Sequence, residues 1–190
     1  SDCLVGSEMC IRDSGEGFVN SLEKDCNFKT KGKIALIIGA GGAARGIILS
    51  LIKRGVREII LMNRNRKRLM KIKEQFKKDS NEILKTQEWS EKIIPNFVDL
   101  LINCTSVGMR EGESLDINLT EMKKTSIIYD IVYTKESTQL IKEAKKHGLA
   151  TQRGHAMLVR QAAESFKIWF EEYPNEDEII GLIRDFGKMT

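Results

Sequence analysis

The chain has 190 residues, of which 41% are hydrophobic and 31% are charged, a balance that supports one hydrophobic core of ordinary size. Its formal net charge of +4 is too small to require a nucleic-acid partner or a membrane surface. Glycines and Arg45 interrupt the longest apolar stretch, residues 34–52, so we expect no membrane span and a cytoplasmic protein.

The N-terminal residues 1–14 show neither the apolar stretch of a signal peptide nor a periodic pattern. We therefore expect them to be a foreign or disordered leader, and residues 15–190 to form the folded domain, opening with a helix at residues 15–22. The four cysteines have no metal-ligand spacing and no secretory context. We expect reduced thiols and no metal site.

Apolar runs and helical periodicities alternate from residue 34 onward. Uninterrupted runs of Ile, Leu and Val are typical of buried parallel strands. Strands are expected over residues 34–38, 58–62, 82–86, 99–104, 126–132 and 150–153, and the helices between them over residues 43–53, 66–78 and 135–147. This alternation predicts a doubly wound α/β domain with a mostly parallel, Rossmann-like sheet and helices on both faces.

Two further helices are expected near the C-terminus, over residues 156–170 and 176–186, with Pro174 breaking the chain between them. The first is amphipathic, with an apolar stripe formed by Leu158, Ala162, Phe166 and Trp169. The second should turn Ile179, Ile180 and Ile183 inward.

A glycine-rich turn joins the first strand to the helix at residues 43–53. It consists of Gly39, Ala40, Gly41, Gly42 and Ala43. In a doubly wound domain such a turn lets backbone N–H groups approach a pyrophosphate at the helix N-terminus. The alternative is a tight strand-to-helix turn without a ligand.

The end of the second strand indicates which dinucleotide is bound. An NAD site would have Asp or Glu there to hold the ribose 2′-hydroxyl, whereas this chain has Asn63 and Arg64, followed by Asn65 and Arg68. A guanidinium can stack on adenine and form paired hydrogen bonds with a 2′-phosphate. We infer NADP; the alternative is a set of surface arginines on a basic helix.

Six motifs resemble those of shikimate dehydrogenases, in the same order. They are Gly15–Phe18, Gly39–Ala44, Asn63–Arg64, Asn103–Met109, Asp130–Tyr133 and Gly154–Ala163. The resemblance covers residues 15–190 and implies an oxidoreductase that reversibly reduces 3-dehydroshikimate to shikimate with NADPH, on the chorismate route to aromatic amino acids. It also implies a small-molecule substrate, with no nucleic acid and no membrane. It leaves the oligomeric state open.

The resemblance implies a role for individual residues. The pyrophosphate would be held by Gly39, Ala40, Gly41, Gly42 and Ala43, and the phosphate of the adenosine half by Asn63, Arg64, Asn65 and Arg68. The middle of the cofactor would run along Asn103, Thr105 and Ser106. The nicotinamide would be bordered by Ile131, Gly154 and Met157. Tyr133 and Gln161 would touch the substrate. Without the resemblance, Met157 and Tyr133 are equally well explained as packing residues.

The chain departs from the family pattern at its N-terminus. Family members begin with a substrate domain that includes a catalytic lysine; we expect this domain to be absent here, and Ser14 stands where the family aspartate would fall. We therefore expect no catalytic residue in the chain, which should bind NADP but turn over little substrate. The alternatives are a non-catalytic NADP-binding module, a quinate/shikimate relative, or another dehydrogenase with a similar cofactor half.

Overall fold

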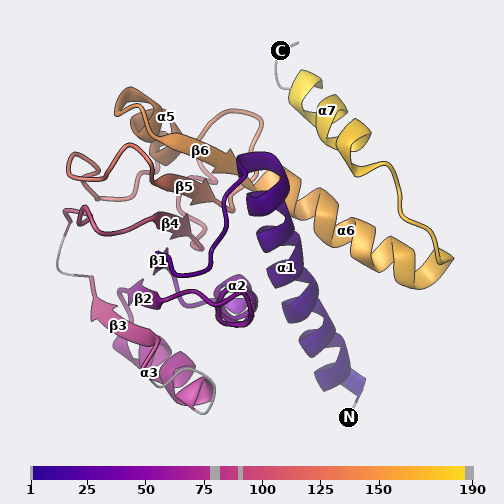
Figure 1. The fold of residues 1–190 in the computed structure, drawn as a ribbon, viewed down its shortest axis with the longest axis horizontal. Coiled ribbons are helices and arrows are strands. Elements are labelled where there is room, and N and C mark those ends of the chain that lie inside the picture. Colours follow the sequence, from indigo (N-terminus) through magenta and orange to yellow (C-terminus); the bar gives the residue numbers. More distant parts are fainter. Residues whose placement is uncertain (1, 78–81, 90–91, 187–190) are drawn as a thin grey trace.

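The computed structural model describes residues 2–77, 82–89 and 92–186, which form one six-stranded sheet with helices on both faces (Figure 1). The strands are β1 (Ile34–Ile38), β2 (Glu58–Asn63), β3 (Leu84–Glu88), β4 (Leu100–Asn103), β5 (Ile127–Asp130) and β6 (Ala150–Arg153). The helices are α1 (Asp2–Cys26), α2 (Gly42–Lys53), α3 (Arg66–Gln75), α5 (Gln139–Lys146), α6 (Gly154–Phe170) and α7 (Glu176–Phe186). The strand order is β3-β2-β1-β4-β5-β6, and every pairing is parallel. The predicted doubly wound fold is confirmed.

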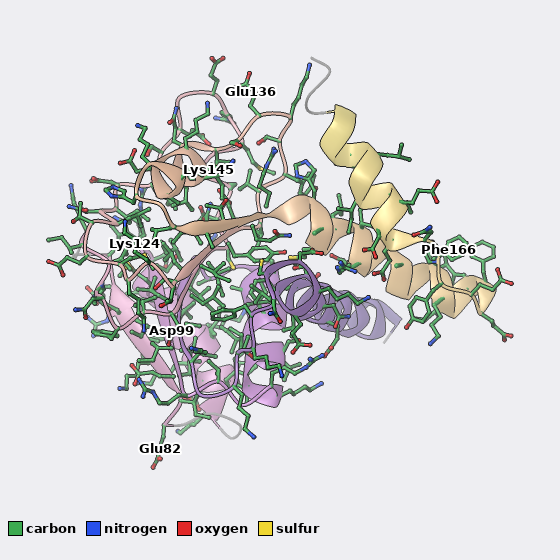
Figure 2. The ribbon with its side chains drawn as sticks, turned by 45° about the horizontal axis from the view of Figure 1, so that its top comes forward. Glu82, Asp99, Lys124, Glu136, Lys145 and Phe166 are labelled. Carbon is green, nitrogen blue, oxygen red and sulfur yellow. The ribbon has the colours of Figure 1, made fainter. Side chains whose placement is uncertain are left out.

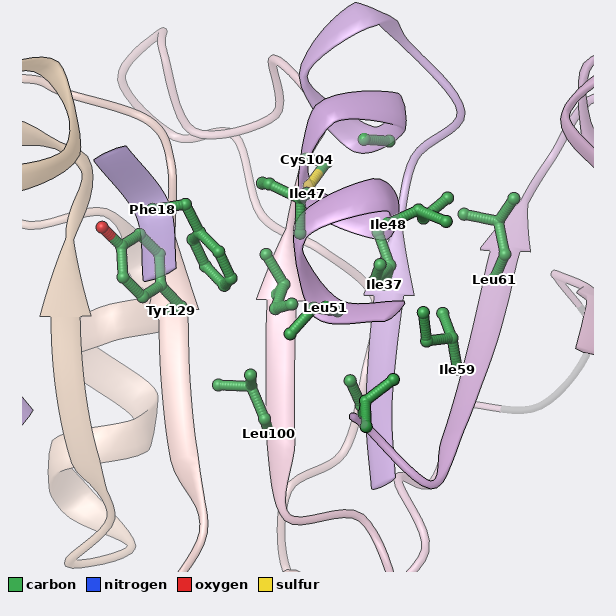
Figure 3. Close-up of a cluster of buried hydrophobic side chains, with 14 of the residues drawn as sticks. Phe18, Ile37, Ile47, Ile48, Leu51, Ile59, Leu61, Leu100, Cys104 and Tyr129 are labelled. Carbon is green, nitrogen blue, oxygen red and sulfur yellow. The ribbon is translucent and has the colours of Figure 1, made fainter. Parts of the chain in front are cut away.

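Successive residues of the central strands enter two different cores, as the pleat of a β-strand requires. Ile37 of β1 packs with α1, α2 and α3 in the first core, whereas Leu36 and Ile38 pack in the second with α5. Figure 3 shows the first core, where Ile47, Ile48 and Leu51 of α2 lie over the sheet and Phe18 of α1 lies against Tyr129 of β5. Strands buried on both faces explain why the sequence shows continuous apolar runs.

Helix α1 begins at Asp2, so the prediction that residues 2–14 contain no periodic element is wrong. Once the later turns of a helix have formed, each residue added to its end gains one backbone hydrogen bond. The helix can therefore extend over residues 2–14 without an apolar stripe. The foreign origin of this segment stays a prediction.

Two glycines let α1 approach its neighbours closely. A Cβ at Gly15 would overlap the carbonyl group of Gly46 in α2, and one at Gly17 would lie 2.9 Å from the Met157 carbonyl oxygen in α6. Because these neighbours are backbone atoms, they cannot move aside as a flexible side chain can. The Gly15–Phe18 motif is therefore explained by helix packing.

We expect Gly15→Ala to lower the free energy of unfolding by about 1 to 3 kcal/mol, since the added methyl group forces α1 away from α2. Gly181→Ala in α7 is the matched control, because a Cβ there meets no atom within 4 Å. That change should be neutral or stabilise by up to about 1 kcal/mol through helix propensity. Urea unfolding of both variants measures the difference, and equal stabilities would contradict the packing argument.

Several element boundaries differ from the predictions. Strand β3 lies two residues later than expected because it pairs with β2, with Glu88 opposite Asn63. The predicted strand at 126–132 and helix at 135–147 are both shorter, since residues 131–138 form the turn between β5 and α5. The last residue of the helix predicted at 66–78 lies outside the described residues.

The apolar stripe predicted for α6 is not the buried face. Leu158 is 42% exposed and Trp169 is 74% exposed, whereas Ala156, Val159 and Arg160 are buried. The buried face is set by contacts with α1 and α7, and the far end of α6, marked by Phe166 in Figure 2, extends beyond the sheet. In α7, Ile180 is buried and Ile183 packs beside it, but Ile179 is 38% exposed, contrary to the prediction. Among the described residues, no helix is long and apolar enough to cross a membrane.

Candidate functional site

The predicted site residues gather at one edge of the sheet. Gly39 follows β1, Arg64 follows β2, Ile131 follows β5 and Gly154 follows β6, while Asn103 ends β4. Because all six strands are parallel, their carboxyl ends meet at the same edge, which is where doubly wound domains bind ligands. The topology therefore brings together positions more than a hundred residues apart in the sequence.

The glycine-rich turn has the shape of a phosphate cradle. Gly39 has φ +108°, and a Cβ there would lie 2.8 Å from the Cys104 carbonyl group, so only glycine fits. Gly41 is the N-cap of α2 and provides no side-chain cap, and the first turn of the helix contains no acidic residue. Gly41 and Gly42 are exposed, with open space where a Cβ would be. Uncapped N–H groups beside open space suit a pyrophosphate.

The end of β2 carries the arginines and asparagines of the predicted adenosine site. The Asn65 side chain caps α3 by accepting a hydrogen bond from the Arg68 N–H at 3.1 Å. Asn63 Nδ2 donates to the Asn65 carbonyl at 3.2 Å. The two asparagines thus shape the turn, on which Arg64 lies exposed. Arg68 lies exposed in the first turn of α3, which contains no acidic residue.

Asn103 lies beneath the site. Its side chain is fully buried, and its Oδ1 accepts hydrogen bonds from the N–H and the hydroxyl of Thr105, at 3.0 and 2.7 Å. The Thr105 methyl group in turn packs against Gly39. Ser106, next along the chain, is exposed at the edge of the sheet. The structure therefore links the turn after β4 directly to the glycine turn.

Asp130, at the end of β5, is a central residue of this edge; the sequence analysis included it in a motif but predicted no role for it. Its Oδ1 accepts from Asn103 Nδ2 at 2.9 Å and from the Val132 N–H at 3.1 Å, and its Oδ2 accepts from the Thr138 hydroxyl at 2.6 Å. Burial raises the pKa of Asp130 above its ordinary value, and the three hydrogen bonds partly offset that effect. The signal available in the sequence was a lone carboxylate ending an apolar strand.

The loop after β5 is held from the next strand. Arg153, the last residue of β6, donates to three successive backbone carbonyls, those of Thr134, Lys135 and Glu136. These bonds hold the loop that presents Tyr133, whose side chain is 51% exposed. Arg153 was also missed, because nothing in the sequence near it indicates this contact.

Gly154 and Ile131, both predicted to border the nicotinamide, are in direct contact. A Cβ at residue 154 would overlap the Ile131 carbonyl, so the close approach requires glycine. Burial, and secondarily Arg153, lower the pKa of the neighbouring His155 below its ordinary value, which favours the neutral imidazole. Met157 is only 6% exposed and belongs to the first core, whereas Gln161, one turn further along α6, is half-buried.

Burial disfavours the reactive thiolate form of the cysteine at this edge. Cys104 is buried beside Gly39, and burial raises the pKa of its thiol far above neutrality, so it stays protonated. In the described part of the chain, no cluster of three or more His, Cys, Asp or Glu side chains could hold a metal ion.

Known proteins are similar to this chain in both sequence and fold. A shikimate dehydrogenase (NADP(+)) from Pelagibacter ubique is 38% identical over 169 residues, which are 88% of this chain and 60% of the relative. A crystal structure of a shikimate dehydrogenase in complex with NADP+ has a TM-score of 0.81 at 29% identity, covering 92% of this chain and 61% of that one. The 5-ketofructose reductase of Gluconobacter sp. strain CHM43 also has a TM-score of 0.81, at 28% identity and with 92% and 62% covered. The chain thus spans about 60% of the length of these proteins.

Two family models match successive parts of the chain. The model described as Shikimate 5'-dehydrogenase C-terminal domain matches residues 154–184, which comprise α6 and most of α7. The model described as Shikimate / quinate 5-dehydrogenase matches residues 21–133, from α1 to the loop after β5. That second match takes in the glycine turn, the arginines after β2 and the Asp130 network, and it spans more than half of the 190 residues. The chain therefore belongs to the shikimate / quinate 5-dehydrogenase family.

Proposed function

We propose that this chain binds NADP and is the cofactor-binding part of an NADP-dependent shikimate dehydrogenase, which reversibly reduces 3-dehydroshikimate in the cytoplasm. The observation that carries the proposal is Arg64, exposed directly after β2, together with the uncapped glycine turn after β1. In an NAD site the position after β2 is acidic, and a carboxylate there would repel a 2′-phosphate. The proposal is supported by a relative whose name specifies NADP(+) and by a solved neighbour in complex with NADP+.

NADPH, when bound, supplies the hydride that reduces a ketone carbon. The chain's own residues bind and orient it. The backbone N–H groups of Gly41–Ala43 would hold the pyrophosphate, and Arg64 and Arg68, assisted by Asn63 and Asn65, would hold the 2′-phosphate of the adenosine half. The sheet order places β4, β5 and β6 on the other side of β1 from β2, so the nicotinamide half would lie toward Thr105, Ser106, Ile131 and Gly154.

The substrate would approach from the nicotinamide side. Tyr133, on the loop held by Arg153, and Gln161, on α6, are the proposed contacts with shikimate. Met157, buried below them, would support the nicotinamide through the core. Ser14, which we expect at the position of the family aspartate, would not replace a carboxylate, because a hydroxyl does not ionise near neutral pH.

Two features bear on which ketone is reduced. The 38% and 36% identical relatives from Pelagibacter ubique and Geobacillus are both named shikimate dehydrogenase (NADP(+)). A structural neighbour of equal TM-score to the NADP+ complex is named 5-ketofructose reductase, so the cofactor fold alone does not select the substrate. The sequence relatives therefore favour shikimate.

The proposed cofactor is tested by calorimetric titration of the purified chain with NADP and, separately, with NAD. We expect NADP to bind at least about tenfold more tightly, since hydrogen bonds to a charged phosphate contribute roughly 1.5 to 3 kcal/mol. As a control, 2′,5′-ADP, which carries the 2′-phosphate but no nicotinamide, should compete with NADP. Equal affinities for NADP and NAD would contradict the proposal.

A further inference from the structure

Trp89, the first residue after β3, lies beside Arg64 at the proposed adenosine end of the site. We propose that Trp89 is a specificity-determining residue, whose indole ring holds the Arg64 guanidinium in place to receive the 2′-phosphate of NADP. The inference rests on the proposed function and adds to it a residue outside all the predicted site motifs.

The parallel register of β2 and β3 explains the contact. Asn63 pairs with Glu88, the last residue of each strand. The residues that follow, Arg64 and Trp89, therefore lie side by side just beyond the carboxyl ends of β2 and β3. The guanidinium carbon of Arg64 lies 5.5 Å from the centroid of the indole ring. That distance is within the range of about 6 Å in which a cation is attracted to an aromatic face.

The two partners differ in how firmly they are held. Trp89 is half-buried and packs against the second core, which contains Met62 of β2 and Ile94 beyond β3. Arg64 is exposed, and among the described residues its side chain has no carboxylate partner. The indole is thus held by packing, whereas the guanidinium is exposed to solvent. Restricting a long side chain before binding reduces the entropy lost when the ligand arrives.

The contact leaves the phosphate-binding groups of Arg64 free. Indole has a hydrogen-bond donor but no acceptor atom, so the Trp89 ring does not occupy the N–H donors of the guanidinium. Glu88 is the nearest acidic residue on β3, and it pairs with Arg66 at 3.4 Å. This ion pair partly neutralises a carboxylate that would otherwise repel the incoming phosphate. The charges and the geometry at the carboxyl ends of β2 and β3 therefore both favour a 2′-phosphorylated nucleotide.

The chain has only two tryptophans, which makes the inference directly measurable. Trp169→Phe leaves Trp89 as the sole indole, and Trp89→Phe leaves Trp169, which is 74% exposed near the end of α6. Saturation with 2′,5′-ADP should change the emission of the Trp169→Phe variant and leave that of the Trp89→Phe variant unchanged. A Trp89 emission that does not respond to saturating 2′,5′-ADP would overturn the inference.

Affinity provides the second arm of the experiment. In Trp89→Leu, we expect NADP binding to weaken about 3- to 10-fold and NAD binding by less than about 2-fold, with Trp89→Phe in between because it keeps an aromatic face. An unchanged ratio of NADP to NAD affinity in Trp89→Leu would reject the inference. If Trp89→Leu does not fold, the inference is tested instead by the affinities of Trp89→Phe and by the emission of Trp89. Wild-type protein that fails to prefer NADP rejects the proposed function itself, whatever Trp89 does.

Discussion

Replacing Arg64 with aspartate should weaken NADP binding about 100-fold or more and leave NAD binding within a few-fold of wild type. The substitution removes a charge-assisted pair of hydrogen bonds, worth roughly 3 kcal/mol, and places a carboxylate against the dianionic 2′-phosphate. NAD carries a 2′-hydroxyl at that position, which can donate a hydrogen bond to the aspartate carboxylate. Arg64 is exposed on a turn shaped by Asn63 and Asn65, so its replacement should not disturb the fold.

The control for this prediction is Arg57→Asp, which changes the net charge by the same amount. Arg57 is exposed and precedes β2, at the opposite edge of the sheet from Arg64. Calorimetric titration of both variants with NADP and NAD, repeated at two salt concentrations, separates a local contact from a general charge effect. If both variants lose NADP affinity equally, Arg64 has no specific role.

Replacing Arg160 with alanine should lower the free energy of unfolding by about 3 to 5 kcal/mol, the range found when one partner of a buried ion pair is removed. Arg160 lies in α6 with only 1% of its side chain exposed. It donates to Asp25 at the end of α1, at 2.7 Å, and to Glu176 at the start of α7. Its loss would leave both carboxylates without their buried partner at the point where three helices meet.

Lys24→Ala is the matched control, because Lys24 also pairs with Glu176, at 3.2 Å, but is 60% exposed. An exposed pair of this kind should contribute less than about 1 kcal/mol. Arg160→Met keeps most of the apolar volume of the side chain, so it separates lost packing from lost charge, and we expect most of the destabilisation to remain. Urea unfolding followed by circular dichroism gives all three values. A loss in Arg160→Ala no larger than in Lys24→Ala would show that the three-helix contact is not important for stability.

The sheet and its two layers were predictable because their signal is local. Apolar runs such as residues 34–38 and 58–62 identify strands buried on both faces, and helical spacing between them identifies the crossovers. Leu140, Ile141 and Ala144 of α5 follow the same rule, since they recur at helical spacing and are buried. Here, local pattern and tertiary packing agree.

The stripe predicted for α6 shows where that agreement ends. Leu158 and Trp169 recur at helical spacing, yet the buried face carries Arg160, which the pattern places among polar residues. A charged side chain can be buried only when its partners are present, and those partners are 135 and 16 residues away in the sequence. Periodicity within one helix cannot contain that information.

The sequence alone predicts the doubly wound sheet, the glycine-rich turn and an arginine suited to a 2′-phosphate. Each of these features depends on residues that lie within a few positions of one another in the chain. The supports of the site depend on the folded chain: Trp89 against Arg64, Asp130 beside Asn103 and Arg153 across the loop after β5. Each of these contacts joins residues from different strands or loops, and it forms only once the parallel register has brought the carboxyl ends of the strands to one edge.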